Sequence, residues 1–376
     1  MNLSDSSKLE QSEFERYARH LSLPQFGVEG QVALKQSRVT IIGCGGLGAP
    51  VSLYLAAAGV GEIKLVDSDT VALSNLQRQI TFTERDIGRA KAEVTREALL
   101  TRNSSIKVEA VQTQLNNSNA QALLSDSDLV LDCCDNAPTR YVINENCRRL
   151  GIPWVYASIF QFSGQCALIK PTGPCFQCIF PDTNAQAASC NEAGVIGVLP
   201  GVMGSIQSLT AIKQLANLEP VETTELILVE TLEMQMRRIR VEQRSDCPVC
   251  RELPDHRQQQ QVGNRLHEKA QTMNSSDSPT IDCAELQQLM ANDAIYLIDV
   301  RERDEHMRQN IGGSNIPLSE LATAQLPLDR PIVFYCQMGA RSLQAQQWAS
   351  AVADHDNCRS LEGGIVRFLE NTPSAY

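Results

Sequence analysis

Residues 38–48 read RVTIIGCGGLG, a short β-branched run followed by a glycine-rich loop. Pro50 fits the first turn of a helix that follows the loop, and Gly59 fits the C-terminal cap of that helix. Glycines let a backbone approach phosphate groups closely, and a helix N-terminus supplies oriented N–H groups. The stretch therefore predicts a nucleotide-phosphate loop, with a glycine turn that binds no ligand as the plainer alternative.

Strand and helix patterns alternate after this loop. Residues 62–67, 106–112 and 128–132 read as strands, whereas residues 89–100 and 139–149 read as helices. Repeated strand–helix units with buried strands predict an α/β fold, with a Rossmann-like, mainly parallel sheet and helices on both faces.

Composition limits the class of protein. The chain has 376 residues, of which 43% are hydrophobic and 20% charged, and its net charge is −11. These values fit two or three folded domains and argue against a general nucleic-acid binder, which needs a basic surface. No apolar stretch reaches the roughly 18 residues that span a bilayer, and residues 1–5 do not resemble a secretory signal. We expect a cytoplasmic protein that binds neither nucleic acid nor membranes.

The composition changes abruptly after Asp255, where polar residues such as the QQQQ run at 258–261 replace the apolar periodicity. Such a stretch is typical of a linker. We predict a first domain at residues 1–252, a flexible linker at 253–279 and a second, smaller α/β domain at 280–376.

Polar groups follow two of the predicted strands. Asp67 ends the strand after the glycine loop, where an acidic side chain can bind ribose hydroxyls of NAD or ATP. The SNLQRQ segment at 74–79 and Lys91 add amide and cationic groups, which a triphosphate under attack requires and a hydride transferase does not. Asp135 and Asn136 could hold magnesium at the carboxyl edge of the sheet. Each group alone could be a surface residue or helix cap, but together they favour ATP.

Thirteen cysteines are unusual for a chain with no export signal, and a reducing setting requires a reason other than disulfides. Two CxxC pairs offer one such reason, because four thiolates complete a closed tetrahedral zinc site. A redox CxxC is the alternative for either pair. We predict one structural zinc per chain, bound by Cys175, Cys178, Cys247 and Cys250.

A further cysteine, Cys336, comes directly after the strand pattern at 332–335 and before a helix. Backbone N–H groups and the helix dipole stabilise a thiolate at such a place, and the same arrangement would stabilise a persulfide anion. A buried core cysteine is the alternative.

Residues 16–251 resemble MoeB and ThiF, the ancestral branch of the ubiquitin-activating-enzyme superfamily. The segments that carry the resemblance are RYARH at 16–20, the glycine loop, AAAGVG at 56–61, DSD at 67–69, SNLQRQ at 74–79, GRAK at 88–91 and DCCDN at 132–136. Cys134 stands where relatives often have Thr or Ser.

This resemblance implies an ATP site with the phosphates near Gly46, the ribose on Asp67, and Arg78 and Lys91 at the triphosphate. Asp135 would be the carboxylate associated with Mg²⁺, and Arg19 would reach the site from the partner subunit of a homodimer. Cys190 would form a covalent intermediate in a crossover loop, although a buried structural cysteine is the usual alternative. The implied cofactor-binding residues are Gly43, Gly45, Gly46, Gly48, Asp67, Ser74, Asn75, Leu76, Gln77, Arg78, Lys91, Asp135, Asn136 and, in trans, Arg19.

Residues 280–370 resemble a single-domain rhodanese, which carries sulfane sulfur as a cysteine persulfide. The LEGG segment at 361–364 belongs to the resemblance, and Phe368 stands where many relatives have Trp. The loop is one residue shorter than in the related phosphatases, which favours sulfur over phosphate. The implied persulfide loop consists of Cys336, Gln337, Met338, Gly339, Ala340 and Arg341.

Together the two resemblances imply an adenylyltransferase fused to a sulfurtransferase. ATP would activate the C-terminal glycine of a ubiquitin-like sulfur carrier that ends in Gly-Gly, and Cys336 would supply sulfur received from a donor such as a cysteine desulfurase. A non-catalytic nucleotide-binding scaffold and an NAD-dependent oxidoreductase are the alternatives. The sequence does not choose among molybdopterin, thiamine, tRNA-thiolation and other sulfur pathways.

Overall fold

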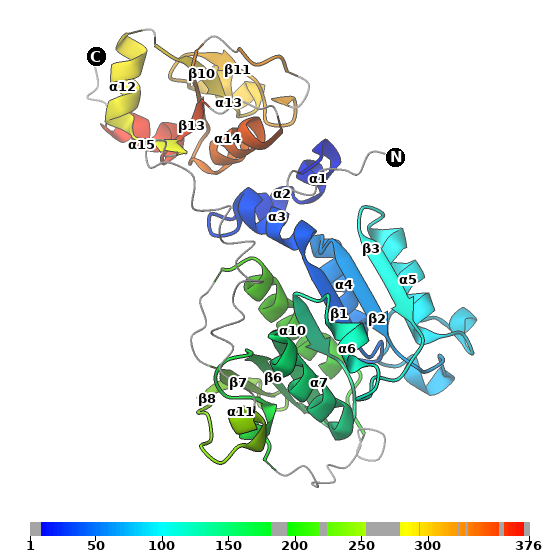
Figure 1. Cartoon of the computed structure of the whole chain (residues 1–376). Coiled ribbons are helices and arrows are strands. Elements are labelled where there is room, and N and C mark those ends of the chain that lie inside the picture. Colours follow the sequence, from blue (N-terminus) through cyan, green and yellow to red (C-terminus); the bar gives the residue numbers. More distant parts are fainter. Residues whose placement is uncertain are drawn as a thin grey trace. The chain divides into compact units, whose positions relative to one another are not determined.

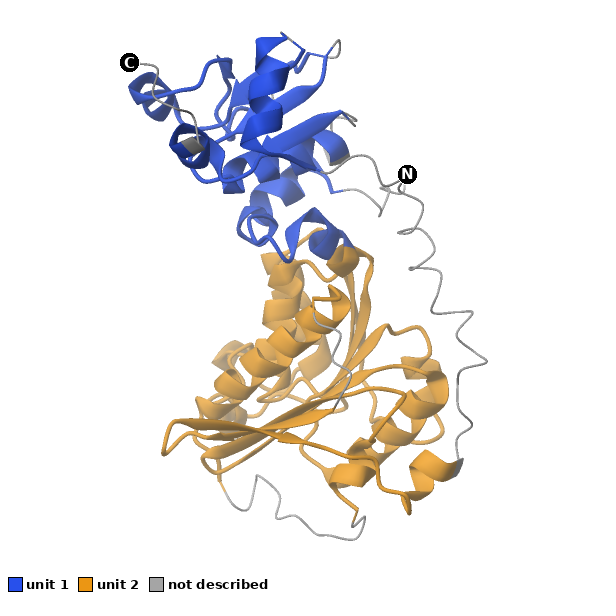
Figure 2. Ribbon diagram, turned by 90° about the vertical axis from the view of Figure 1, so that its left-hand side faces the viewer, with its two compact units in different colours: residues 1–32, 265–376 blue, residues 33–264 orange. Residues whose placement is uncertain are grey.

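The chain folds into two compact units, each built around its own sheet. The structure is a computed structural model that describes residues 9–181, 194–218, 224–252, 279–292, 294–321, 324–327, 330–352 and 357–371. One unit comprises residues 33–264, and the other comprises residues 1–32 and 265–376 (Figure 2). Among the described residues, no helix has both the length and the apolar character needed to cross a bilayer.

The 33–264 unit contains an eight-stranded sheet in the order β3-β2-β1-β4-β5-β6-β7-β8 (Figure 1). The first five strands of this order are parallel, and the last three pairings are antiparallel. The strands are β1 (Arg38–Ile42), β2 (Glu62–Val66), β3 (Lys107–Val111), β4 (Leu129–Asp132), β5 (Trp154–Phe160), β6 (Ser163–Ile169), β7 (Glu225–Glu230) and β8 (Gln235–Arg240).

Helices cover both faces of this sheet. α4 (Gly48–Ala58) packs on α10 (Leu199–Leu215), whereas α6 (Ala120–Leu124) packs on α7 (Ala137–Leu150), and Figure 1 shows these pairs on opposite faces. β1 lies between β2 and β4, and its four C-terminal residues are buried. The remaining elements are α5 (Lys91–Arg102), α8 (Phe176–Ile179), α11 (Pro248–Glu252) and the 3-10 helices η1 (Leu73–Asn75) and η2 (Glu84–Asp86).

The second unit contains a smaller, wholly parallel sheet in the order β11-β10-β12-β13-β9. Its central strand β12 is buried along its whole length, as a strand covered on both faces must be. The strands are β9 (Thr280–Ile281), β10 (Tyr296–Asp299), β11 (Ser314–Asn315), β12 (Ile332–Tyr335) and β13 (Cys358–Leu361). The helices are α12 (Cys283–Ala291), α13 (Arg303–Arg308), α14 (Ala340–Val352) and α15 (Gly364–Asn371).

The N-terminal helices α1 (Gln11–Arg16) and α2 (Ala18–Leu21) belong to this second unit, and α3 (Gly27–Gln36) leads from it into the first. Phe14 and Leu21 are buried in one apolar cluster with Phe334 and Trp348, and the Trp348 indole N–H donates to Gln11 at 3.0 Å. The compact units therefore differ from the predicted boundaries, which assign residues 1–252 to one domain. Of the predicted linker, only residue 279 lies among the described residues.

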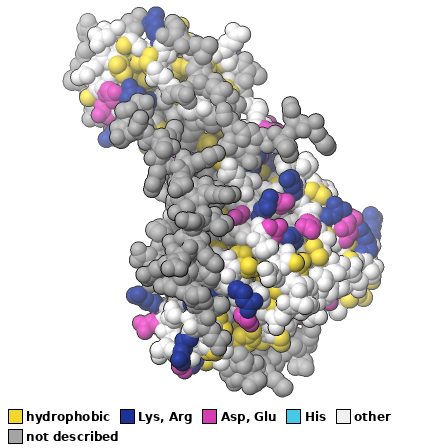
Figure 3. Space-filling view, viewed as in Figure 1, with side chains coloured by type: hydrophobic (Ala, Val, Ile, Leu, Met, Phe, Trp, Pro, Cys, Tyr) yellow, Lys and Arg dark blue, Asp and Glu magenta, His cyan; other side chains and the backbone are white. Residues whose placement is uncertain are grey.

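The predicted fold class is confirmed: a mainly parallel α/β sheet with helices on both faces, accompanied by a second, smaller α/β unit. The predicted C-terminal cap at Gly59 is also confirmed, because this residue ends α4 with φ 87°. The antiparallel strands β6, β7 and β8 were not predicted. On the face of the 33–264 unit shown in Figure 3, acidic and basic side chains are interspersed.

Candidate functional site

The glycine loop lies between the carboxyl ends of three neighbouring strands. The Gly43 N–H donates to the Val66 carbonyl at 2.9 Å, and Gly43 has φ 97°, which favours glycine. A Cβ atom at Gly43 would lie 2.6 Å from the Cys133 carbonyl oxygen, and one at Gly48 would lie 2.0 Å from the Gly43 oxygen. Glycine is thus required at both positions, because the loop backbone is in contact with backbone on either side.

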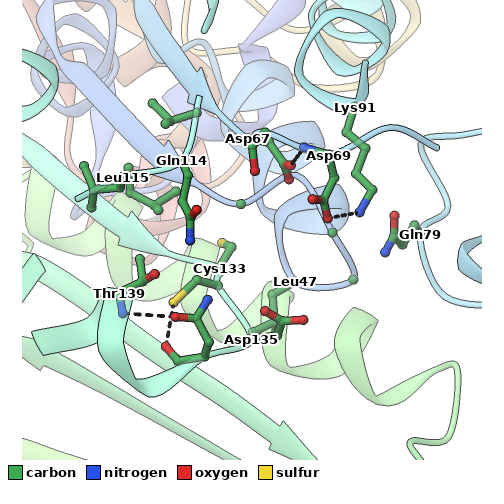
Figure 4. Close-up of a pocket in the computed structure, with 18 of the residues that line it drawn as sticks. Leu47, Asp67, Asp69, Gln79, Lys91, Gln114, Leu115, Cys133, Asp135 and Thr139 are labelled. Atoms are coloured by element: carbon green, nitrogen blue, oxygen red, sulfur yellow. Dashed lines mark hydrogen bonds and ion pairs between the residues drawn. The ribbon is translucent and has the colours of Figure 1, made fainter. Parts of the chain in front are cut away.

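A cavity opens over this loop (Figure 4). Its lining combines backbone of the loop with polar side chains that follow β2, β3 and β4, as expected for a ligand site at the carboxyl edge of a parallel sheet. The residues that line it are Ile42, Gly43, Gly45, Gly46, Leu47, Val66, Asp67, Ser68, Asp69, Arg78, Gln79, Lys91, Thr113, Gln114, Leu115, Cys133, Cys134, Asp135, Asn136, Thr139, Arg140, Ile159 and Val195.

Asp67 is held in place by two backbone donors. Its Oδ2 accepts from the Cys44 N–H at 2.7 Å, and its Oδ1 accepts from the Asp69 N–H at 2.8 Å. Burial raises the pKa of Asp67, while these two N–H groups act in the opposite direction. The carboxylate is therefore oriented before any ligand binds, at a place where it can accept hydrogen bonds from ribose hydroxyls.

The cationic end of the cavity is formed by Lys91 and Arg78. Lys91, at the first position of α5, is only 6% exposed, and its Nζ pairs with Asp69 Oδ2 at 2.9 Å. Arg78 donates through Nη1 to the Ser74 carbonyl at 3.1 Å. Both side chains line the cavity near Gly45 and Gly46, so they can offset the charge of a polyphosphate.

The opposite wall rests on a buried ion pair. Asp132, fully buried at the end of β4, accepts from Arg140 Nε at 3.2 Å, and Arg140 Nη2 donates to the Cys134 carbonyl at 2.9 Å. Asn136 caps α7, where its Oδ1 accepts from the Thr139 N–H at 3.0 Å. These bonds fix the turn that exposes Asp135 at the cavity, where a carboxylate oxygen is available to a hard divalent cation.

Eight of the fourteen predicted cofactor-binding residues line this cavity: Gly43, Gly45, Gly46, Asp67, Arg78, Lys91, Asp135 and Asn136. Gly48 does not line it but packs against the Gly43 backbone of the loop. Ser74, Asn75, Leu76 and Gln77 are not among the lining residues, and Asn75 Oδ1 instead accepts from the Ala72 N–H at 3.1 Å. Arg19 belongs to the other compact unit.

Sequence reasoning missed several residues of the lining. Gln79 stands in the quoted SNLQRQ segment but was not assigned to the site, and Gln114 and Leu115 follow the predicted strand at 106–112. The signal that could have found them is position, because side chains just beyond neighbouring parallel strands meet at one edge. Arg140 carried no such signal, since it lies inside α7.

The four CxxC cysteines meet in three dimensions. Their sulfur atoms all lie within 4.8 Å of one another, with Cys175 Sγ 3.6 Å from Cys247 Sγ and Cys178 Sγ 3.5 Å from Cys250 Sγ. All four residues are buried. Four thiols in this arrangement match the donor set of a closed tetrahedral metal site, and they could hold a zinc ion.

Cys336 occupies the predicted place at the end of β12. Its Sγ accepts from the Gly339 N–H at 3.2 Å and from the Ser342 hydroxyl at 3.5 Å, and the residue is only 1% exposed. Arg341 donates to both carboxylate oxygens of Glu305 at 2.7 Å, and these hydrogen bonds lower the pKa of Glu305 to about 2. The loop thus forms a rigid cradle around one sulfur atom.

A second buried ion pair supports this loop. Arg301, 2% exposed, pairs with the fully buried Asp299 at 2.7 Å and donates through Nη1 to Gln337 Oε1 at 3.0 Å. Met338 is 67% exposed and Ala340 begins α14. Cys190, the remaining predicted catalytic residue, lies outside the described residues.

Two family models match this chain, one over its larger N-terminal part and one near its C-terminus. The ThiF family model matches residues 17–249, and the rhodanese-like domain model matches residues 282–371. The chain is 37% identical to the probable adenylyltransferase/sulfurtransferase MoeZ of Mycobacterium tuberculosis, over 97% of this chain and 95% of that protein. It is 43% identical to the sulfur carrier protein adenylyltransferase of Thermus thermophilus, over 65% of this chain and 94% of that protein.

A solved structure of E. coli MccB with ATP is also similar. It aligns with a TM-score of 0.56 and 26% identity, covering 62% of this chain and 74% of that chain.

The buried pair of Asp132 and Arg140 leads to a prediction about how the free energy of unfolding depends on pH. Replacing Arg140 with methionine leaves the Asp132 carboxylate without its cation, and we expect a loss of about 3 kcal/mol of unfolding free energy at neutral pH. Burial raises the pKa of Asp132 and Arg140 opposes this rise, so the native state of the variant binds the proton more tightly than the native state of wild type. The deficit relative to wild type should therefore shrink as pH falls, as urea unfolding at a series of pH values would measure.

The matched control is the double variant Asp132→Asn, Arg140→Met, which has no buried carboxylate without a cation, so its deficit should not shrink as pH falls. A deficit in the single variant that stays constant across the same pH range would contradict the assignment of the effect to Asp132.

Proposed function

From the fact that this chain belongs to the ThiF family and carries a rhodanese-like domain at its C-terminus, we propose that it adenylylates a ubiquitin-like sulfur carrier and then delivers sulfur to it. The chain is an adenylyltransferase and sulfurtransferase enzyme, as its full-length relatives are. We propose three further points: that the substrate is a sulfur carrier, that the carrier ends in Gly-Gly, and that the sulfur reaches it by the route described below. Relatives named for a sulfur carrier protein and for SAMP activation support the choice of substrate.

One observation carries the adenylation half: the glycine loop, Asp67, Arg78 and Lys91 line a single cavity. Asp67 suits a ribose in either ATP or NAD, but two cations in the cavity suit the higher charge of a triphosphate better than the diphosphate of NAD. Asp135 would hold Mg²⁺, which would neutralise phosphate charge when bound. The NAD-dependent oxidoreductase is therefore the weaker alternative.

The reaction we propose is an in-line displacement. A carboxylate oxygen of the carrier's terminal glycine attacks the α-phosphorus of ATP, and the bond to the β-phosphate bridging oxygen breaks. Pyrophosphate leaves with the electron pair, and a carrier acyl-adenylate remains. Lys91 and Arg78 contribute by holding the triphosphate and offsetting its charge, and backbone N–H groups of the glycine loop assist.

Adenylation predicts ATP–pyrophosphate exchange that depends on a carrier ending in Gly-Gly. Lys91→Ala should lower the exchange rate by about 100-fold, since it removes a cation from the phosphate end of the cavity. Lys107→Ala, which removes an exposed cation on β3, should leave exchange unchanged and serves as the control. Absence of exchange in the wild-type protein with every such carrier would refute the proposal.

For the sulfur half, we propose that the Cys336 thiolate takes the outer sulfur from a persulfide donor such as a cysteine desulfurase, whose own thiolate leaves. The resulting persulfide then attacks the acyl-adenylate, and AMP leaves as an acyl disulfide forms. Attack by the Cys190 thiolate on the Cys336 sulfur would release the carrier thiocarboxylate. A disulfide between the two cysteines would remain, and a small-molecule thiol would have to reduce it.

Cys336→Ala should abolish sulfur uptake from persulfide or thiosulfate donors, as mass spectrometry of the 32-Da adduct on the protein would detect. The cradle formed by Gly339 and Ser342 surrounds only this sulfur, so we expect no other cysteine in the rhodanese-like domain to substitute for it. Cys283→Ala is the matched control, since Cys283 is half-buried in the same unit but outside the loop. Full sulfur uptake by Cys336→Ala would show that another residue carries the sulfur.

We further propose that the four-cysteine cluster binds one structural zinc per chain. Cys250→Ser should then reduce the zinc content measured by plasma mass spectrometry from about one to near zero per chain and lower the melting temperature. Cys147→Ser, a buried cysteine outside the cluster, should retain the metal. Wild-type protein that contains no zinc and withstands chelators without loss of stability would exclude this role.

The proposal also includes a homodimer in which Arg19 of one subunit serves the ATP site of the other. It rests on the resemblance of the RYARH segment to the family, and the exposure of Arg19 is compatible with it. The pathway served by the carrier is left open.

A further inference from the structure

The side chain of Gln79 lines the nucleotide cavity, but none of the roles described above involves it. It is 4% exposed, and its Oε1 has no hydrogen-bond partner among the described residues. A buried amide oxygen without a donor is unfavourable, because folding removes the water that would otherwise satisfy it. Such an atom at a ligand cavity is explained if its donor becomes available only when the ligand binds.

Gln79 is fixed in place by its own backbone and by the glycine loop. Its N–H donates to the Asn75 carbonyl at 3.0 Å, and its carbonyl accepts from the Phe82 N–H at 3.1 Å. A Cβ atom at Gly45 would lie only 3.5 Å from Gln79 Nε2, so the amide packs directly against the loop. The side chain is therefore held at the phosphate end of the cavity without a bond to its oxygen.

Lys91 is a strong donor at that end of the cavity. Figure 4 shows the Gln79 amide and the Lys91 ammonium at the same end of the cavity. An ammonium group has three donors, and Lys91 gives one to Asp69, whose side chain is 65% exposed. A bound triphosphate would draw the ammonium away from this solvent-facing carboxylate and into the cavity.

We propose that Gln79 is a positioning residue for phosphate chemistry: its Oε1 accepts a hydrogen bond from Lys91 once the triphosphate is bound. This rests on the proposed adenylation at the same cavity. A neutral amide suits this role better than a carboxylate, since it orients the ammonium without neutralising the charge that the phosphates require. Asp69 would then hold Lys91 in the empty site, and Gln79 would hold it in the occupied one.

The test is steady-state ATP–pyrophosphate exchange by the full-length protein, with separate determination of kcat and KM for ATP. Gln79→Met keeps the length of the side chain and removes the acceptor, so kcat should fall about tenfold with a smaller change in KM. Thr81→Val is the matched control, because Thr81 Oγ1 is also buried and unpartnered but does not line the cavity. Thr81→Val should leave exchange unchanged.

A role through Lys91 predicts non-additivity. In a Lys91→Ala background, Gln79→Met should cause no further loss, since the group that it positions is absent. The same tenfold loss in both backgrounds, or equal exchange by Gln79→Met and Thr81→Val, would overturn the inference. Gln79→Leu, with melting temperatures for every variant, provides a second test if Gln79→Met does not fold.

These outcomes are distinct from failure of the proposed function. If wild-type protein shows no exchange with any carrier, the adenylation proposal fails first. If wild-type protein exchanges normally and the Gln79 variants behave like wild type, only the role of Gln79 is refuted.

Discussion

The close contact between the glycine-loop backbone and its neighbouring strands is the constraint on which the nucleotide site depends. The Gly43 N–H is bonded to β2, while its α-carbon faces the backbone of Cys133 beyond β4 with no room for a side chain. The loop is therefore held between the two strand ends that carry Asp67 and Asp135. Because backbone rather than flexible side chains sets these spacings, the cavity is formed before any ligand binds.

Different kinds of interaction stabilise the two walls of this cavity. Backbone hydrogen bonds and steric fit hold the glycine loop and Asp67. The Asp135 turn instead depends on the buried pair of Asp132 and Arg140, whose stability requires both charges. A second buried pair, Asp299 with Arg301, supports the Cys336 loop in the other unit in the same way. In both units a buried aspartate at the end of a parallel strand anchors an arginine that holds the functional turn.

Local sequence signals predicted much of the fold, because β-branched runs, glycine caps and strand-end polar groups act over a few residues. They found β1, β2, β4 and β12, the glycine loop and Cys336. They did not find β6, β7 and β8. The pairings of β5 with β6 and of β7 with β8 are local hairpins with connections of two and four residues, whereas the pairing of β6 with β7 joins segments far apart in the chain. Arg140 was missed because an arginine inside α7 carries no sign in the sequence that it donates to the buried Asp132 at the end of β4.

The resemblance named more residues of the SNLQRQ segment than line the cavity. The SNLQRQ segment was assigned to the ATP site from Ser74 to Arg78, yet Arg78 and the neighbouring Gln79 are its members that line the cavity. A turn presents only some of its side chains to one side, and the sequence alone does not indicate which. The meeting of the two CxxC pairs was more predictable, because four thiols would have to come together to share one metal, and their sulfur atoms do lie together.

The remaining cysteines bear on the chemistry as well. A persulfide can pass its sulfur to any accessible thiolate, so an enzyme that carries one needs its other thiols protonated or shielded. Burial raises the pKa of these thiols in the 33–264 unit, to about 12 for Cys166 and further for Cys44, Cys133, Cys134 and Cys147. These groups are poor nucleophiles and poor sulfur acceptors. Their burial therefore keeps these thiols of the 33–264 unit from competing for the sulfur that Cys336 would carry.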